Sequence, residues 1–228
     1  MKRGKKYQNA AQKIEAGKFY MLEEAAQMVI DTSVTKFDAS VEIHMKLGVD
    51  PKQAEEQIRS TVSLPHGTGK TVRVIAFVSD DKVKDAKAAG AMEAGNTDLI
   101  EKIEKGWLDF DTAVATPDMM KDLAKIARVL GQAGLMPNPK SGTVTAKPAE
   151  AVKEAKAGKV EFRVDKQSIV HIAVGKASFK PEQLAENAKT VLKAIADAKP
   201  ASVKGTYVQK VTMTTTMGPS VKIALSEI

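Results

Sequence analysis

The sequence feature that most constrains the fold is a change in hydrophobic pattern between the ends of the chain and its middle. Residues 39–48, ASVEIHMKLG, alternate, with apolar side chains at every odd position from 41 to 47. This alternation predicts a half-buried strand of an antiparallel sheet with one polar face. Residues 71–78, TVRVIAFV, are apolar almost throughout, which is typical of a strand that is covered on both faces.

The middle of the chain alternates between predicted strands and predicted helices. Strands are expected at residues 71–78, 112–116 and 143–146. Helices are expected at residues 80–89, 97–105, 117–130 and 148–157, and the last two are expected to end at Gly131 and Gly158. Strands and helices at this spacing indicate a small α/β unit around a parallel sheet.

The two ends of the chain carry the antiparallel pattern. The expected elements are helices at 22–30 and 181–198, a short helix after Asp50-Pro51, and a strand at 57–65. Two hairpins are also expected, one from strands 159–164 and 168–177 around Asp165-Lys166-Gln167, and one from strands 206–216 and 220–225 around Met217-Gly218-Pro219.

This order of patterns is interpreted as two domains, the second inserted into the first. Residues 1–67 and 160–228 are expected to form one discontinuous domain, and residues 68–159 an inserted α/β domain. A pair of chain crossings between two domains permits hinge motion.

The composition limits the classes of protein to which the chain can belong. It has no cysteine, which excludes a disulfide framework and fits a reducing compartment. The basic N-terminus precedes no apolar segment, and no stretch approaches the ~18 apolar residues of a membrane helix, so we expect a soluble, cytoplasmic protein. A net charge of +7 favours an anionic partner, and residues 160–228 hold the largest basic excess, with ten basic and six acidic residues.

Residues 65–74, PHGTGKTVRV, look like the end of a phosphate-binding loop. The full motif needs a glycine five residues before the Gly69-Lys70 pair, and Leu64 stands there. The segment also leads into a predicted strand, so no helix N-terminus is available for a triphosphate. We therefore interpret it as a crossing between the domains, and expect Lys70→Ala to change no nucleotide affinity.

The sequence contains no recognisable catalytic constellation. His44, His66 and His171 form no metal-ligand pair, and a strand face or the core is the default position for His44 and His171. Residues 134–140, GLMPNPK, are interpreted as a rigid loop, with a binding role as the alternative. We expect neither an enzyme nor a bound metal or cofactor.

Residues 211–223, VTMTTTMGPSVKI, carry no charge from Val211 to Val221. A threonine run favours a strand and Gly-Pro favours a turn, which puts Met217 at the tip of that turn. Taken alone, the stretch fits an ordinary edge strand and turn with Met217 packed under a neighbour.

Five stretches together closely resemble the bacterial large-subunit ribosomal protein L-one family. In chain order they are KFDASVEIHMKLGVDPK, VSLPHGTGKTVRV, GLMPNPKSGTV, EFRVDKQSIVHIAVGKASF and TTTMGPSVKI. The resemblance runs over essentially the whole chain. It implies a fold of both α+β and α/β type, in which a split α+β sandwich from both chain ends carries an inserted Rossmann-like, three-layer α/β domain.

The resemblance also implies the partners. Family members bind large-subunit ribosomal RNA and form the mobile lateral stalk near the exit site, where they assist the release of deacylated tRNA. They also bind a similar structure in their own operon mRNA and repress its translation. We therefore expect a structural ribosomal protein, monomeric when free of the ribosome. The alternatives are a nucleotide-dependent enzyme on the central α/β unit and a non-specific DNA-binding protein.

The family's RNA-contact positions carry over to the two ends of this chain. The RNA-binding residues that the resemblance implies are Lys36, Phe37, Ser40, Glu42, Asp165, Lys166, Thr216, Met217, Gly218 and Ser220. Relatives often have threonine at the position of Ser40. The chain departs from the family pattern at Gln132-Ala133, where many members read Pro-Arg, so a basic residue of the inserted domain is missing.

The chemistry of these residues suits the shallow minor groove of an RNA duplex, where sugars and 2′-hydroxyls are exposed. Thr216 and Ser220 offer short hydroxyls, and Gly218 allows the backbone a close approach. The flexible side chain of Met217 can pack against sugars and bases. The lysines expected to steer the RNA are Lys36, Lys166, Lys176 and Lys222.

Overall fold

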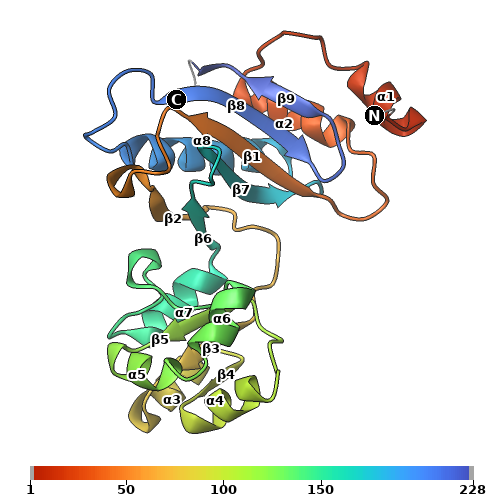
Figure 1. Ribbon diagram of the computed structural model, residues 1–228. Coiled ribbons are helices and arrows are strands. Elements are labelled where there is room, and N and C mark those ends of the chain that lie inside the picture. Colours follow the sequence, from red (N-terminus) through yellow and green to blue (C-terminus); the bar gives the residue numbers. More distant parts are fainter. Residues whose placement is uncertain (1–2, 226–228) are drawn as a thin grey trace. The chain divides into compact units, whose positions relative to one another are not determined.

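The computed structural model describes residues 3–225 of a chain that mixes helices with several β-sheets (Figure 1). It forms two compact units. Unit 1 comprises residues 1–69 and 160–228, and unit 2 comprises residues 70–159. Residues 1–2 and 226–228, with which the expected discontinuous domain begins and ends, lie outside the described residues.

Unit 1 is built on a four-stranded antiparallel sheet. Its strands, in spatial order, are β7 (Ile169–Lys176), β1 (Ser40–Leu47), β8 (Val208–Thr215) and β9 (Ser220–Ile223). The alternation predicted for β1 is confirmed, since every odd position from 41 to 47 is buried and every even position from 40 to 46 is at least partly exposed. The predicted pairing of β8 with β9 is confirmed as well.

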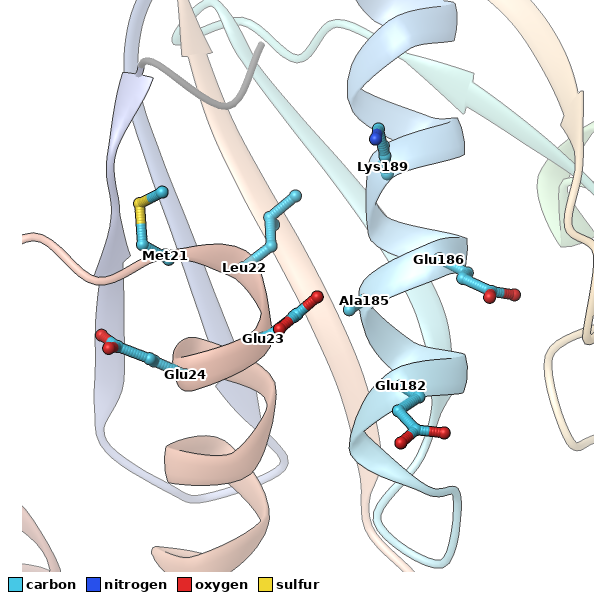
Figure 2. A pocket seen from close by; sticks show the side chains of 8 residues that line it. All are labelled: Met21, Leu22, Glu23, Glu24, Glu182, Ala185, Glu186 and Lys189. Atoms are coloured by element: carbon cyan, nitrogen blue, oxygen red, sulfur yellow. The ribbon is translucent and has the colours of Figure 1, made fainter.

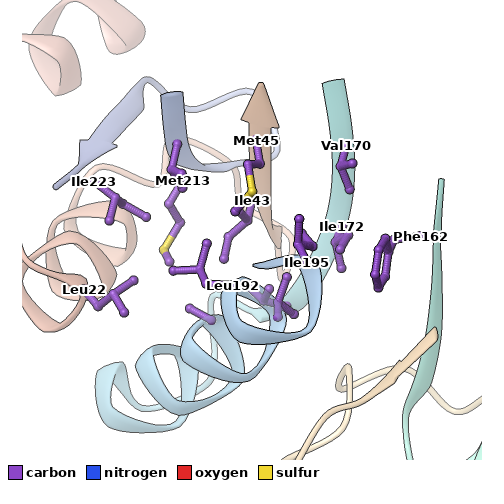
Figure 3. Close-up of a cluster of buried hydrophobic side chains, with 14 of the residues drawn as sticks. Leu22, Ile43, Met45, Phe162, Val170, Ile172, Leu192, Ile195, Met213 and Ile223 are labelled. Carbon is purple, nitrogen blue, oxygen red and sulfur yellow. The ribbon is translucent and has the colours of Figure 1, made fainter. Parts of the chain in front are cut away.

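Two helices, α2 (Leu22–Asp31) and α8 (Pro181–Asp197), pack on one face of this sheet. Helix α8 begins at a proline, whose fixed φ suits the first helical position. It buries Leu184, Val191 and Leu192 at helical spacing. Figure 3 shows side chains of these helices and of the sheet, among them Leu22, Leu192, Ile43 and Met213, meeting in one core. Each fully buried Ile, Leu or Met side chain there stabilises the fold by roughly 1.5–3 kcal/mol.

Helices α2 and α8 leave the other face of the sheet uncovered. The even positions of β1 point to it, and so do their neighbours across the sheet. On β7 and β8, respectively, the neighbours of Glu42 are Ala173 and Thr214. Those of His44 are His171 and Thr212. We call this surface the open face.

The other elements of unit 1 differ from the prediction in two places. They are helix α1 (Lys5–Ala11), the 3-10 helix η1 (Ala54–Glu56), β2 (Arg59–Ser63) and β6 (Lys159–Arg163). The segment after Asp50-Pro51 forms only the single turn η1. The predicted hairpin of residues 159–177 forms only beside its turn, through one antiparallel bridge between Val164 and Val170, while β6 pairs with β2 in a separate two-stranded sheet.

Unit 2 contains the predicted parallel sheet. Its strands lie in the order β4 (Glu93–Gly95), β3 (Val74–Phe77) and β5 (Thr112–Ala115). All four residues of β3 are buried, because apolar clusters cover the sheet on both faces. Residues 143–146 form one bridge, Ala115 to Val144, rather than a strand.

The helices of unit 2 follow the prediction except between residues 117 and 134. The elements are α3 (Asp80–Ala88), α4 (Thr97–Glu104), η2 (Pro117–Met119), α5 (Met120–Leu123), α6 (Ala127–Ala133), η3 (Pro139–Ser141) and α7 (Pro148–Lys156). Gly131 lies inside α6, and Gly134, with φ of 72°, ends that helix. No helix in the described part of the chain is long and apolar enough to cross a membrane.

Candidate nucleic-acid interface

The turn between β8 and β9 presents the most unusual residue of unit 1. The amide of Gly218 donates to the carbonyl oxygen of Thr215 at 2.9 Å, which closes a β-turn over Thr216 and Met217. The side chain of Met217 is 76% exposed. It therefore does not pack under a neighbour, as an ordinary edge turn would favour.

The backbone of Met217 is in the left-handed region, with φ of 64°. A residue with a side chain pays about 1–2 kcal/mol for that conformation, which usually falls to glycine or asparagine. Ser168, with φ of 62°, is the other non-glycine residue with positive φ among residues 3–225. These two residues lie in, or directly beside, the two turns that carry candidate RNA-binding residues.

Gly218 has a reason within the protein to lack a side chain. A Cβ at this position would collide with the hydroxyl oxygen of Thr215, which is buried. The sequence argument explained Gly218 by the close approach of a partner. The internal collision is a second reason, which the sequence alone does not reveal.

The turn is joined to the start of β1. The Ser40 amide donates to Thr216 Oγ1 at 3.1 Å, and the Thr216 amide donates to the Ser40 carbonyl at 3.0 Å. Lys176 Nζ, at the end of β7, donates to Ser40 Oγ at 2.9 Å. Three distant segments of the chain thus meet at one end of the open face.

The loop before β1 carries Lys36 and Phe37. The ring of Phe37 is 61% exposed, three residues before Ser40. Asp38 holds this loop, because its carboxylate accepts from the amide and the hydroxyl of Ser178 at 3.0 and 2.9 Å. Phe37 and Met217, both strongly exposed, therefore belong to the same end of unit 1.

Glu42 and Ser220 share one row of the open face. Glu42 pairs with Thr214 on β8, and Thr214 pairs with Ser220 on β9. Lys222, one row further along β9, lies over the ring of Phe19 at 5.7 Å from its centroid. The neutral turn is thus bordered by one carboxylate and by Lys176 and Lys222.

Asp165 and Lys166 lie at the opposite end of the sheet. The register pairs Lys46 with Ile169 at that end, about 17 Å along β1 from the pair of Val41 and Thr215. The structure therefore places the ten candidates in two groups. Eight lie on or next to the Thr216 end, and Asp165 with Lys166 forms the second group.

Asp165 has a structural function in its turn. Its Oδ1 accepts from the amides of Ile169 and Gln167, each at 2.8 Å. These bonds, that from Ile169 most of all, hold the pKa of the Asp165 carboxyl below its usual value. Lys166, next to it at the tip, is exposed.

Between the two groups lies a histidine pair that sequence reasoning missed. His44 and His171 face each other across β1 and β7, with Nδ1 to Nδ1 at 2.7 Å. The strand-face position expected for both is confirmed, but their pairing depends on a register that no local pattern specifies. Burial lowers the pKa of His44, as does the nearby His171, while Glu42 opposes this shift.

The loop-like segment with Lys70 has a structural explanation. Lys70 Nζ donates to Asp111 Oδ1 at 2.6 Å, and the segment leads to β3, as predicted. The backbone amide of Arg73 and its Nε both donate to Asp111 Oδ2 at 3.1 Å. Lys70 thus helps to fix the start of β3 beside that of β5.

The loop at residues 134–140 is likewise organised internally. Asn138 Oδ1 accepts from the Lys140 amide, and the Asn138 amide donates to Thr143 Oγ1, both at 2.8 Å. These bonds support the interpretation of a rigid loop. Among residues 3–225, no group of three or more His, Asp or Glu is placed to hold a metal ion.

A groove between α2 and α8 lies on the helical side of unit 1 (Figure 2). Its volume is about 590 Å³. The charged side chains that line it are Glu23, Glu24, Glu182, Glu186 and Lys189. Four carboxylates against one ammonium repel phosphate, so this groove is not a candidate surface for nucleic acid.

Unit 1 thus combines an open sheet face with a neutral polar turn, exposed apolar side chains and neighbouring lysines. The family model described as the ribosomal protein L1p/L10e family matches residues 29–219, and the chain therefore belongs to this family. A relative from Macrococcus caseolyticus, large ribosomal subunit protein uL1, is 55% identical over 227 residues. The match covers 100% of this chain and 98% of the relative.

Membership of this family confirms three predictions from the sequence. The chain belongs to a family of ribosomal proteins and is not an enzyme. Bacterial ribosomal proteins work in the cytoplasm, so the expected localisation is confirmed too.

Proposed function

We propose that this protein is a structural constituent of the large ribosomal subunit and binds large-subunit ribosomal RNA through the Thr216 end of unit 1. The observation that carries this proposal is Met217. It is strongly exposed in a backbone conformation that costs stability. Such local strain persists where the surrounding structure imposes it, and it clusters at functional sites.

The composition of this end of unit 1 matches what a structured RNA exposes. Duplex RNA is read mainly by shape and by contacts to 2′-hydroxyls and phosphates, because its major groove is deep and narrow. Met217 and Phe37 offer apolar surface for sugars and unstacked bases. Ser220 is an exposed hydroxyl that can donate or accept. Thr216 is bound to Ser40, so its function is mainly to hold the turn in place.

The lysines supply attraction without sequence preference. Lys36 and Lys166 are exposed, one at each end of the open face, and Lys176 and Lys222 border the neutral turn. Each lysine that neutralises a phosphate releases a counterion, so affinity from these contacts falls with salt. The turn, which has no charge, adds specificity that salt leaves largely unchanged.

Within this proposal, unit 1 is the discontinuous RNA-binding domain and unit 2 is the inserted Rossmann-like domain. Unit 2 has a parallel sheet with apolar clusters on both faces, as such a domain requires. Gln132 and Ala133 are exposed on α6 and carry no charge, so we expect unit 2 to add little to RNA affinity.

We propose more specific functions for the same surface. The bound protein would form the mobile lateral stalk near the exit site and assist the release of deacylated tRNA. Because this surface would read the shape of RNA, it would also bind a similar structure in the protein's own operon mRNA. Free protein would then repress translation of that message. We propose that the free protein is a monomer.

A competition experiment tests the proposed partner. A labelled fragment of structured large-subunit ribosomal RNA is bound at moderate salt, and unlabelled RNA, duplex DNA or ATP is added. Only the ribosomal RNA should displace the label at low concentration. Equal displacement by duplex DNA would contradict the proposal, and saturable ATP binding that Lys70→Ala removes would favour a nucleotide-dependent enzyme.

A further inference from the structure

A row of four ionisable side chains crosses the open face of unit 1. His44 Nδ1 and His171 Nδ1 lie 2.7 Å apart at the centre. His171 Nε2 lies 3.4 Å from Asp165 Oδ2, and His44 Nε2 lies 3.9 Å from Glu42 Oε2. The two imidazoles thus connect a carboxylate in one turn with a carboxylate on β1.

The distance between the Nδ1 atoms limits how many protons the pair can hold. Two nitrogens at 2.7 Å share one proton, because two N–H groups cannot face each other at that separation. A proton on His171 Nε2 meets Asp165, and a proton on His44 Nε2 points toward Glu42. With a single positive charge on the pair, one proton lies between the Nδ1 atoms and each Nε2 carries one, 3.4 Å from Asp165 and 3.9 Å from Glu42.

A second positive charge has no place in this arrangement. It would put a proton on both Nδ1 atoms, and the rings would have to separate. The lowered pKa of His44, due first to burial and then to His171, agrees with this limit. The backbone also keeps the two rings side by side, because His44 and His171 are directly opposed in the register of β1 and β7.

We propose that His44 and His171 share one proton and act as positioning residues that hold Glu42 and Asp165 in place on the RNA-binding face. This inference rests on the function proposed above. It explains how a surface for RNA can include two carboxylates, because Nε2 of each ring lies beside one of them, at hydrogen-bond distance from Asp165 and within 4 Å of Glu42.

Other charged groups point to the open face from every strand of the sheet. They are Glu42 and Lys46 on β1, Lys176 on β7, Lys210 on β8 and Lys222 on β9, with Asp165 in the turn before β7. Thr212, the neighbour of His44 on β8, is uncharged. The two carboxylates are therefore the acidic groups that face the pair within the described sheet and its turns.

The first experiment follows the two imidazoles in the free protein. Ring proton resonances are recorded by NMR between pH 8 and pH 4.5 for the full chain, for His44→Gln and for His171→Gln. The wild-type rings should titrate together in two separated steps, and the ring left in each variant in one step. Independent single steps for both wild-type rings would contradict the proposal that the rings share one proton.

The second experiment measures affinity for ribosomal RNA at pH 7.5. Each single variant should bind about five- to tenfold more weakly, and the double variant no more weakly than either, because one substitution already breaks the row. The control is His66→Gln, since His66 pairs with Glu186 on α8 and should leave affinity unchanged. Additive losses, or none, would contradict the positioning function.

A pH series separates positioning from simple charge. On going from pH 7.5 to pH 5, wild-type affinity should fall about fivefold relative to the double variant, as the rings separate and release the carboxylates. A relative rise would mean that the pair acts as plain positive charge, and would overturn the proposal. If wild type bound no ribosomal RNA at all, the proposed function would fail, while the NMR titration would still decide whether the proton is shared.

Discussion

At the scale of single residues, Met217 combines a costly backbone with a side chain that leaves the core. Its φ of 64° favours glycine or asparagine, yet the residue is methionine and is 76% exposed. Sequence pattern alone predicted the turn and its tip. It did not predict the strain, because the sign of φ depends on how the turn connects β8 to β9.

Replacing Met217 by asparagine should therefore stabilise the free protein while it weakens RNA binding. Asparagine tolerates the left-handed region, so we expect a gain of up to about 1 kcal/mol in the free energy of unfolding. Urea titrations of wild type and Met217→Asn measure it. A destabilised variant would mean that the methionine packs against the protein and that the strain argument is wrong.

Gly218 offers the opposite case, since any side chain there collides with Thr215 Oγ1. Gly218→Ala should lower the free energy of unfolding by about 1–3 kcal/mol through local overpacking. Gly131→Ala is the matched control, because Gly131 lies inside α6 with nothing within 4 Å of its added Cβ. Urea unfolding should show the control stabilised by about 0.5–1 kcal/mol. Equal effects of both substitutions would argue against the collision.

At the scale of elements, the sequence predicted those whose pattern is local. The alternation of β1 and the apolar spacing of α8 each fix which face is buried, and both predictions are confirmed. The pairing of β6 with β2 was missed, because β2 is about a hundred residues earlier and no local signal specifies it. The end of α6 was misplaced because Gly131 and Gly134 look alike in sequence.

Asp111 ties the starts of β3 and β5 together and should make the stability of unit 2 depend on pH. Its pKa is held far below the ordinary value, first by the hydrogen bond from Arg73 and then by that from Lys70. A lowered carboxyl pKa stabilises the fold above the unfolded pKa of about 3.9, and this stabilisation is lost as pH falls toward the folded value.

Asp111→Asn should accordingly lower the thermal unfolding midpoint at pH 7. The difference between wild type and variant should shrink when both are measured near pH 2.5, where the carboxyl group is already mostly protonated in the unfolded chain while its lowered pKa keeps it charged in the folded one. Calorimetry at the two values tests it. A difference that stays constant would show that Asp111 acts through packing rather than charge.

At the scale of the whole molecule, the protein has two units with separate cores, and only some of their features could be predicted from the sequence. The change in hydrophobic pattern predicted mixed α and β structure, and the family resemblance supplied the partner. Composition gave only a preference for an anionic partner. The division of the candidates between two ends of one sheet, and the histidine pair between them, depend on strand order and register, which only the folded chain determines.

If unit 1 carries the RNA surface, it should bind without unit 2. Because β2 and β6 are neighbours, residues 70–159 can be replaced by a short Gly-Ser linker. The shortened chain keeps the core of unit 1, and we expect its affinity for ribosomal RNA to stay within about tenfold of wild type. Circular dichroism checks its folding, and a folded but non-binding chain would place the RNA surface partly on unit 2.

The most direct test of the account compares two exposed methionines. Met217 is 76% exposed in unit 1 and Met92 is 47% exposed in unit 2. Filter binding to a structured large-subunit ribosomal RNA fragment is measured for Met217→Ala and Met92→Ala over a series of salt concentrations. Met217→Ala should lose about 1–3 kcal/mol of binding free energy with an unchanged salt slope, and Met92→Ala should match wild type. Wild-type affinity for Met217→Ala would contradict the central claim that this turn contacts the RNA.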